Sequence, residues 1–387
     1  MVQRYGDGIV GGSEAHARQV AERLLPFADV QILTTCAKDY TTWDNFYPEG
    51  VEELNGVSIH RFPVIGHRHP DFNQLSDALF ANPHSRRQEI DWLHAQGPVS
   101  PSLLDAIIRV RHETDAFIFF TYLYYTTALG LRLVPDKALL IPTAHDEKPI
   151  YLNIYKSFFH APRGFIFNTE EERAFIYRLF GNDYIPNEIV GVGVDVPENP
   201  SPDRFRKKFG INGPYFLYMG RIVVSKGCQE LIEGFQHYQS IHDDKSSLVL
   251  LGKTEMEIPK NPGVFYGGFV DEQDKFDAIA GCTAVLVPSR FESLSMIALE
   301  AWALEKPVVT TEFCTVVKGM CERSGGGLFY RDSDELAEIL HLLISDDSLR
   351  QRLGEAGMMF VEQNYTWEKV VEKYRKMIDM VVNEKWA

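Results

Sequence analysis

The stretch TAVLVPSRFESLSMIALEAWALEKPVVTT, residues 283–311, decides the fold class. It begins with a short apolar run, crosses a polar loop, continues through a helix-like segment and ends in a second apolar run. Both runs lack polar alternation, as strands buried on both faces of a parallel sheet do. Strand, helix and strand in this order predict an α/β fold with helices covering a parallel sheet.

The same alternation recurs along the whole chain. Apolar runs bounded by turn residues lie between helix-like stretches from one end to the other. We expect strands at 30–35, 57–64, 116–122, 138–144, 164–169, 215–220, 247–252, 283–289 and 307–311. Residues 66–115 break this rhythm and predict a helical insertion or long loops.

Length and charge narrow the class of protein. The chain has 387 residues, which suits two domains. Its 39 basic and 54 acidic side chains give a net charge of −15, so a general nucleic-acid binder is disfavoured. No run approaches the roughly 20 apolar residues of a membrane span, and the start MVQRYGDGIVGG does not resemble a signal peptide. We therefore expect a cytoplasmic protein without nucleic acid as a partner.

The five cysteines are odd in number and widely spaced, with no CxxC pair. Such spacing favours buried, reduced thiols over a disulfide framework or a zinc site.

The glycine-rich start matches GxGxxG through Gly6, Gly8 and Gly11. A dinucleotide site also needs an acidic residue at the end of the second strand, and VQILTTCAK has none there, which argues against NAD. Gly11 and Gly12 before a helix still suit close approach to a phosphate or sugar. The alternative is a tight strand-to-helix turn that binds nothing.

Two cations follow the expected strand 215–220. Arg221 and Lys226 lie in the loop before the next helix, at the strand end where doubly wound sheets hold ligands. An arginine fork with a lysine point charge suits a diphosphate. Two solvated surface cations are the alternative.

Two glutamates in 283–311 are spaced for a nucleotide-linked sugar. Glu292 and Glu300 would be about 12 Å apart if the stretch were fully helical. Glu300 can accept hydrogen bonds from ribose hydroxyls, the amides of Ser293, Leu294 and Ser295 can face a diphosphate, and Glu292 can approach the sugar. The alternative for Glu300, a helix-surface carboxylate, is weakened by its apolar neighbours.

Several ordered stretches together carry a family resemblance. The chain resembles the retaining glycosyltransferases of the GT-B fold, family GT4, with their E-x7-E motif. The matching stretches are GGSEAHARQVAERL (11–24), PTAHDE (142–147), GVGVDV (191–196), GR-x4-KG (220–227), FYGGFV (265–270), PSRFES with ALEAWALEKPVV (288–309) and NYTWEKVVEKY (364–374).

The resemblance implies two doubly wound Rossmann-like domains facing a cleft. The Gly- and Pro-rich segment 181–203 predicts the junction. An acceptor-side domain at 1–190, completed by 366–387, would precede a nucleotide-sugar-binding domain at 191–365. The last helix would cross back to the first domain, and packing within the second domain is the alternative. Its apolar stripe comprises Val370, Val371, Tyr374, Met377, Ile378 and Val381.

The resemblance also implies roles for single residues. Arg221 and Lys226 would bind the donor diphosphate, Glu300 the ribose and Glu292 the transferred sugar. His145 would face that sugar near the reacting carbon, although a histidine satisfied by backbone at a strand end is the alternative. With His145 and Glu292, the two cations would make up the catalytic set.

Backbone contacts would complete the donor site. The Gly11–Gly12 loop would close on the phosphates or the acceptor, and the backbone of Gly268, Phe269 and Val270 would meet the base. Many relatives have Glu-Gly-Phe-Gly where this chain has Glu292, Ser293, Leu294 and Ser295, so this loop must avoid glycine-only conformations, and the donor-sugar selectivity is open.

The expected function is transfer of a sugar, with retention, from a nucleotide-sugar donor to a glycan or lipid-linked acceptor in polysaccharide biosynthesis. Neither a metal nor another cofactor is expected. The alternatives are a nucleotide-sugar epimerase and a catalytically silent sugar-nucleotide-binding protein. Peripheral membrane contact is a further possibility, because six arginines fall in the irregular region of the first domain and could bind an acidic acceptor or a membrane. A solvated face is the simpler explanation for them. These arginines are Arg61, Arg68, Arg86, Arg87, Arg109 and Arg111.

Overall fold

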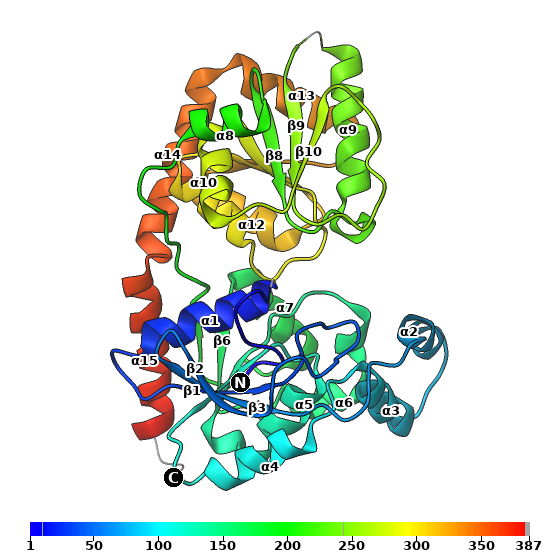
Figure 1. The fold of residues 1–387 in the computed structure, drawn as a ribbon, viewed down its shortest axis with the longest axis vertical. Coiled ribbons are helices and arrows are strands. Elements are labelled where there is room, and N and C mark those ends of the chain that lie inside the picture. Colours follow the sequence, from blue (N-terminus) through cyan, green and yellow to red (C-terminus); the bar gives the residue numbers. More distant parts are fainter. Residues whose placement is uncertain (10, 243, 384–387) are drawn as a thin grey trace. The chain divides into compact units, whose positions relative to one another are not determined.

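The computed structural model describes residues 1–9, 11–242 and 244–383. It divides into two compact units (Figure 1). The first comprises Met1–Val192 with the residues from Val370 onward, and the second comprises Gly193–Lys369. Within the described ranges, no helix is both long and apolar enough to cross a membrane.

The second unit is built on one parallel sheet in the order β10-β9-β8-β11-β12-β13. Its strands are β8 (Tyr215–Met219), β9 (Ser247–Leu251), β10 (Val264–Gly268), β11 (Ala284–Val287), β12 (Val308–Thr311) and β13 (Gly327–Tyr330). The chain leaves β8 in one direction and returns at β11 to continue in the other. The sheet is therefore doubly wound, and its order reverses between β8 and β11.

In the described part of this unit, seven α-helices surround the sheet. They are α8 (Pro202–Phe209), α9 (Cys228–Ile241), α10 (Glu272–Gly281), α11 (Met296–Ala303), α12 (Thr315–Ser324), α13 (Ser333–Ser345) and α14 (Asp347–Asn364). Helix α9 packs on α13, α8 on α10, and α11 and α12 on α14. The four central strands are almost wholly buried between these helices.

The described residues of the first unit form two sheets. One has the order β1-β3-β2 and the other β4-β5-β6-β7, with all pairs parallel except β2–β3. The strands are β1 (Gln31–Thr35), β2 (Gly50–Leu54), β3 (Val57–Phe62), β4 (Phe117–Phe120), β5 (Ala138–Ile141), β6 (Gly164–Phe167) and β7 (Asn187–Ile189).

Residues 1–3 run between these two sheets. The Phe120 amide donates to the Met1 carbonyl at 3.0 Å, and the Thr35 hydroxyl donates to the Gln3 carbonyl at 2.7 Å. The start of the chain is thus hydrogen-bonded to both sheets, and the loop with Gly11 follows it.

The helices of the first unit include an outlying pair. They are α1 (Gly12–Leu24), α2 (Phe72–Ala81), α3 (Arg86–Gln96), α4 (Pro101–Val110), α5 (Tyr125–Gly130), α6 (Asn153–Phe158), α7 (Glu170–Phe180) and α15 (Trp367–Asn383). The irregular segment 66–115 contributes α2, α3 and α4. Helices α2 and α3 stand at the edge of this unit (Figure 1).

Helix α15 confirms that the end of the chain returns to the first unit. In its apolar stripe only Ile378 is partly exposed, and the other members are buried. The ring nitrogen Nε2 of His16 in α1 lies 3.0 Å from the Tyr374 hydroxyl. A methyl group placed on Gly164 of β6 would lie 2.9 Å from the Cε atoms of Met377 and Met380, so α15 packs directly on β6.

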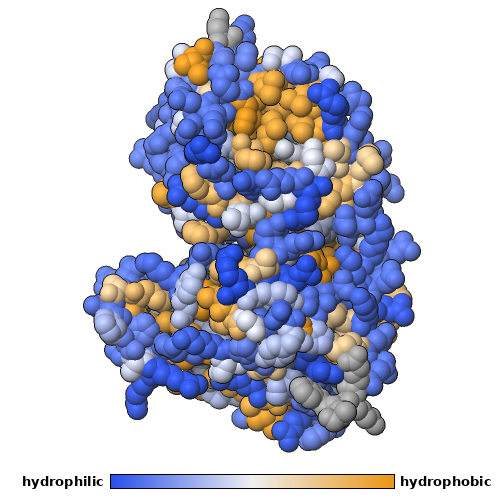
Figure 2. Space-filling model, turned by 180° about the vertical axis from the view of Figure 1, so that it is seen from behind, coloured by the Kyte–Doolittle hydropathy of each residue, from blue (hydrophilic) through white to orange (hydrophobic). Residues whose placement is uncertain are grey.

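All nine expected strands are present, and the five cysteines are buried and free, as predicted. The expectation that the six arginines are solvated, or free to meet an acidic acceptor or membrane, is wrong for Arg61, and Arg68 is partly buried. Arg61 lies on β3, almost fully buried, and pairs with Glu52. Arg68 stacks over Phe72 and donates to the Gln96 side chain at 2.9 Å. Seen from behind, hydrophilic side chains cover most of the surface of both units, broken by apolar patches (Figure 2).

Candidate functional site

Two loops meet where the strand order of the second unit reverses. The loop after β8 carries Arg221 and the turn Val224–Lys226, and the loop after β11 carries Glu292. Doubly wound sheets bind ligands at the carboxyl ends of the strands at this reversal. The structure thus brings Lys226 and Glu292 to that place, and Arg221 leaves β8 at the same edge.

The cation and the carboxylate in these loops pair with each other. The Lys226 ammonium lies 2.8 Å from the Glu292 carboxylate. Both side chains are partly exposed, and a ligand can therefore reach them. Because the Lys226 ammonium carries three donors, it can bind phosphate oxygens while this carboxylate stays near.

The two loops also touch through their backbones. A Cβ on Gly227 would lie 2.4 Å from the Pro288 carbonyl oxygen, and Gly227 has a φ of +73°. Both the close approach and the left-handed conformation require glycine here. The glycine of GR-x4-KG thus sets the spacing of the two loops.

Glu300 has a cationic partner that the sequence did not reveal. The Lys275 ammonium on α10 lies 2.8 Å from its carboxylate on α11. The Glu300 side chain is only 13% exposed. Burial raises the pKa of Glu300, and the positive charge and hydrogen bond of Lys275 oppose that rise. Glu300 is therefore a largely buried carboxylate rather than an exposed one on the helix surface.

The segment between the two glutamates is only partly helical. Helix α11 begins at Met296, so Glu292 lies in the preceding loop and the 12 Å estimate for a fully helical stretch does not apply. No residue from Ser293 to Ser295, all within the described chain, has a positive φ, which confirms that the loop avoids glycine-only conformations. Ser295, the residue before α11, is buried.

The segment expected to meet a base follows β10. Gly268 ends that strand with a φ of +73°, and its carbonyl accepts from the Gly252 amide at 2.7 Å. Phe269 is 61% exposed. Gly268, Phe269 and Val270 thus form a turn at the carboxyl edge of the same sheet, next to the end of β9.

In the first unit, the glycine loop is fixed by a buried carboxylate. Glu14 in α1 pairs with Arg4 and also accepts from Gln3 at 2.9 Å and from the Ser13 hydroxyl at 2.8 Å. A Cβ on Gly11 would lie 2.2 Å from Glu14 Oε2, whereas one on Gly12 would meet nothing within 4 Å. Glycine is required at Gly11 by this carboxylate, and the fold places no such demand on Gly12.

His145 follows β5 in a segment with alternating side-chain directions. Its Nε2 lies 3.6 Å from the Glu147 carboxylate, which also accepts from the Tyr122 hydroxyl at 2.7 Å. Asp146 instead accepts from the Tyr151 hydroxyl at 2.6 Å. Among the described residues no group of three or more His, Cys, Asp or Glu is arranged to hold a metal ion.

Two threonines in strained backbone conformations lie at the ends of the strands that lead to His145. Thr121 after β4 and Thr143 after β5 have φ values of +64° and +49°, and their hydroxyl oxygens are 3.0 Å apart. Positive φ is rare for a β-branched residue and is tolerated where the surroundings enforce it. The ends of these neighbouring strands are therefore held in one arrangement.

A second buried carboxylate fixes the backbone beside His145. Glu172 in α7 accepts from the amides of Ala144 at 2.6 Å and Asn168 at 2.7 Å. Burial raises the pKa of Glu172 to about 8. Glu172, Glu14 and Lys275 were not predicted from the sequence, because each acts on a partner distant in the chain. Ala144 is 28 residues from Glu172, Arg4 is 10 residues from Glu14, and Glu300 is 25 residues from Lys275.

Comparison with known proteins identifies the second unit. Residues 201–359, which span β8, both loops and Glu300, match the family model "Glycosyl transferases group 1". This unit is a group 1 glycosyl transferase domain. The chain is 28% identical to the capsular polysaccharide biosynthesis glycosyltransferase CapM of Staphylococcus aureus, over 43% of this chain and 46% of that protein. It is 24% identical to the uncharacterized glycosyltransferase MJ1607 of Methanocaldococcus jannaschii, over 95% and 94%.

Solved structures resemble the whole chain in fold. A trehalose-6-phosphate protein from E. coli bound with UDP-2-fluoro glucose has a TM-score of 0.71 at 14% identity, with 99% of both chains covered. Anabaena Alr3699/HepE in complex with UDP and glucose has a TM-score of 0.68 at 14% identity, with 98% of this chain and 99% of that one covered. The predicted GT-B fold is confirmed. This chain spans about half the length of CapM.

Proposed function

We propose that the protein is a retaining glycosyltransferase that moves a sugar from a nucleotide-sugar donor to a glycan or lipid-linked acceptor in polysaccharide biosynthesis. The observation that carries the proposal is the meeting of Lys226 and Glu292 at the β8–β11 reversal of a group 1 domain. CapM, a relative by sequence, is named for capsular polysaccharide biosynthesis, and two proteins of the same fold were solved with UDP or a UDP-sugar analogue.

Each donor group has a matching side chain in this proposal. Arg221 and Lys226 bind the diphosphate, and Glu300 accepts hydrogen bonds from the ribose hydroxyls. The backbone of Gly268 to Val270 meets the base, and Glu292 with the amides of Ser293 to Ser295 approaches the sugar and its phosphate. Negative charge grows on the leaving diphosphate as the glycosidic bond breaks, so cations placed there lower the barrier.

The first unit supplies the acceptor side. His145 acts at the sugar end, oriented by Glu147 and by the backbone that Glu172 holds. The loop at Gly11 and Gly12 approaches the phosphates or the acceptor. We further propose that donor binding needs no divalent cation, because Arg221 and Lys226 meet the diphosphate charge, and that the protein works in the cytoplasm, at the inner face of the membrane when its acceptor is lipid-linked.

Incubation with labelled nucleotide sugars in the absence of acceptor tests this function. A transferase should release free sugar slowly, whereas an epimerase would return an epimer and a silent binding protein would return the donor unchanged. A thermal-shift panel of UDP, GDP, ADP and dTDP should identify the base, because a ligand at 100 times its Kd adds about 2.7 kcal/mol to the stability. Loss of sugar release with EDTA and recovery with magnesium or manganese would contradict the metal-free part.

A further inference from the structure

The first unit contains a pocket apart from the residues assigned to the donor. It has a volume of about 110 Å³ and is walled by α3, α5 and α6. A cavity of roughly 150 Å³ lined by aliphatic side chains takes up benzene, so this pocket has room for a branched chain of about five carbons. Most of its wall is apolar, from Ile90, Leu93, Ala128, Leu129, Ile154 and Tyr155.

Two arginines line the same pocket. Arg86 begins α3, and Arg132 follows α5. The Arg132 guanidinium donates to two neutral groups, the Ile154 carbonyl at 2.7 Å and the Ser157 hydroxyl at 3.2 Å. Burial and then the positive charge of Arg86 lower the pKa of Arg132, so the two cations repel each other. The described lining includes no carboxylate to offset them.

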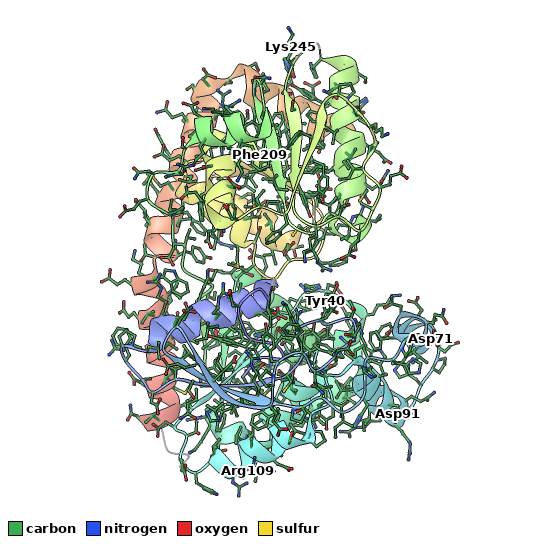
Figure 3. All side chains as sticks on the ribbon, viewed as in Figure 1. Tyr40, Asp71, Asp91, Arg109, Phe209 and Lys245 are labelled. Atoms are coloured by element: carbon green, nitrogen blue, oxygen red, sulfur yellow. The ribbon has the colours of Figure 1, made fainter. Side chains whose placement is uncertain are left out.

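The buried carboxylate of the pocket helix α3 is already engaged elsewhere. Glu89 on α3 is fully buried and accepts from the Asn153 side chain and the Ile154 amide, both at 2.8 Å. These bonds tie α3 to α6 and hold two walls of the pocket at a fixed separation. Asp91, the next acidic residue of α3, is exposed and is absent from the lining (Figure 3).

The pocket is connected to the segment of His145. The Tyr155 ring packs edge-on against Tyr122, with ring centroids 4.9 Å apart. The Tyr122 hydroxyl donates to Glu147, whose carboxylate lies 3.6 Å from His145. A molecule in the pocket therefore rests on a wall that is continuous with the residue assigned to the sugar end.

We propose that this pocket binds the phosphate of a lipid-phosphate acceptor, with the first carbons of its hydrocarbon chain between α3, α5 and α6. The phosphate group of a monoester has three terminal oxygens and can engage both guanidinium forks, which a carboxylate with two oxygens does less completely. The apolar wall accepts hydrocarbon and gives free phosphate no advantage. This inference rests on the proposed transferase function and names the acceptor class.

Calorimetric titration with geranyl phosphate, geraniol and inorganic phosphate tests the site. Geranyl phosphate should bind at least tenfold more tightly than either of the other two. Arg86→Ala should lower that affinity about tenfold or more, and Leu129→Trp should abolish binding by filling the pocket. Arg87→Ala is the matched control, because Arg87 is the exposed neighbour of Arg86 outside the lining, and it should bind as the unaltered protein does.

Three outcomes would overturn the proposal. They are equal binding of inorganic phosphate, unchanged binding in Arg86→Ala, and binding of phosphatidylglycerol vesicles that depends on Arg86 while geranyl phosphate does not bind. Circular dichroism and thermal unfolding, measured on the same samples, show whether each variant is folded. Sugar release from the donor without acceptor reports on the transferase function separately, so loss of one result without the other shows which proposal fails.

Discussion

The Lys275 ammonium lies 2.8 Å from the Glu300 carboxylate, and these two side chains come from the packed helices α10 and α11. Besides Lys275, the charged group that acts on Glu300 is Glu272 of α10, which raises its pKa further. Lys275 thus favours the ionised form of a carboxylate that burial disfavours. An ionised carboxylate accepts from both ribose hydroxyls, whereas a protonated one loses part of that capacity.

Replacing Lys275 should make donor binding sensitive to pH. In Lys275→Met the pKa of Glu300 should rise, because the opposing charge is gone. Nucleotide diphosphate affinity should then increase with pH as Glu300 ionises, by up to tenfold per pH unit below its pKa, and the midpoint should lie higher than in the unaltered protein. Calorimetry between pH 5 and pH 8 measures this midpoint.

Two further variants calibrate the Lys275 experiment. Lys275→Arg keeps the charge and should keep the original pH profile, while Glu300→Gln should give a weak but pH-independent affinity. Tighter binding by Lys275→Met at every pH, with the midpoint unmoved, would mean that Lys275 obstructs the ribose site instead of supporting it.

Loss of Lys226 should slow turnover more than it weakens binding. Its charge meets the diphosphate as negative charge grows, so Lys226→Ala should lower kcat by about a hundredfold or more, with a smaller loss of nucleotide affinity. Lys253→Ala removes an exposed cation after the neighbouring β9 and should change neither quantity by more than about twofold. Equal losses in both variants would point to general electrostatic attraction. Steady-state kinetics with calorimetry decides between them.

The sequence predicts the parts of this molecule whose signal is local. Buried parallel strands are continuous apolar runs, and the nine expected strands all form. The four strands that were not expected lie at or near the edges of their sheets or are short: β2 is largely exposed and carries Glu52 and Glu53, and β7 has three residues. Edge strands lack the apolar pattern of central ones, which explains why they were missed.

The site residues that belong to a sequence motif could be predicted, whereas those that depend on a partner distant in the chain could not. Arg221, Lys226, Glu292 and Glu300 stand in recognisable spacings, and their roles stay predictions. Lys275 looks like any helix-surface lysine until α10 is placed beside α11. Arg61 likewise looks like a surface cation until β3 is placed against Glu52 of β2. The tertiary fold determines the partners of both residues, and no local sequence pattern encodes those partners.

Glu172 should impose its own pH dependence on stability. The ordinary pKa of this carboxyl is 4.5, and burial raises it to about 8 in the folded protein. Between these values the unfolded chain has lost the proton and the folded one keeps it, so stability falls as pH rises. Glu172→Gln removes this slope, which is about 1.4 kcal/mol per pH unit for one proton.

Urea unfolding of both proteins between pH 6.5 and pH 8 measures the Glu172 slope. This range avoids His16, whose burial lowers its pKa to about 4 and makes stability rise between pH 4 and 6.5. Parallel pH profiles for Glu172→Gln and the unaltered protein would show that Glu172 is ionised throughout and that its two backbone donors outweigh burial.

Adjacent glycines separate a structural requirement from a functional one. A methyl group at Gly11 would lie 2.2 Å from Glu14 Oε2, and the bonds to Arg4, Gln3 and Ser13 prevent that carboxylate from moving away. Gly11→Ala should therefore destabilise the protein by about 1–3 kcal/mol. At Gly12 the space is open, and alanine favours the first turn of α1, so Gly12→Ala should keep or slightly raise the Tm.

If the loop approaches the donor or acceptor closely, Gly12→Ala should nevertheless lower kcat/KM by tenfold or more, because the methyl group occupies the ligand's space. Thermal unfolding and steady-state kinetics on both variants measure the two effects separately. Full activity in Gly12→Ala would reduce this loop to a strand-to-helix turn, whereas a stable Gly11→Ala would mean that the Glu14 network yields more easily than its three partners suggest.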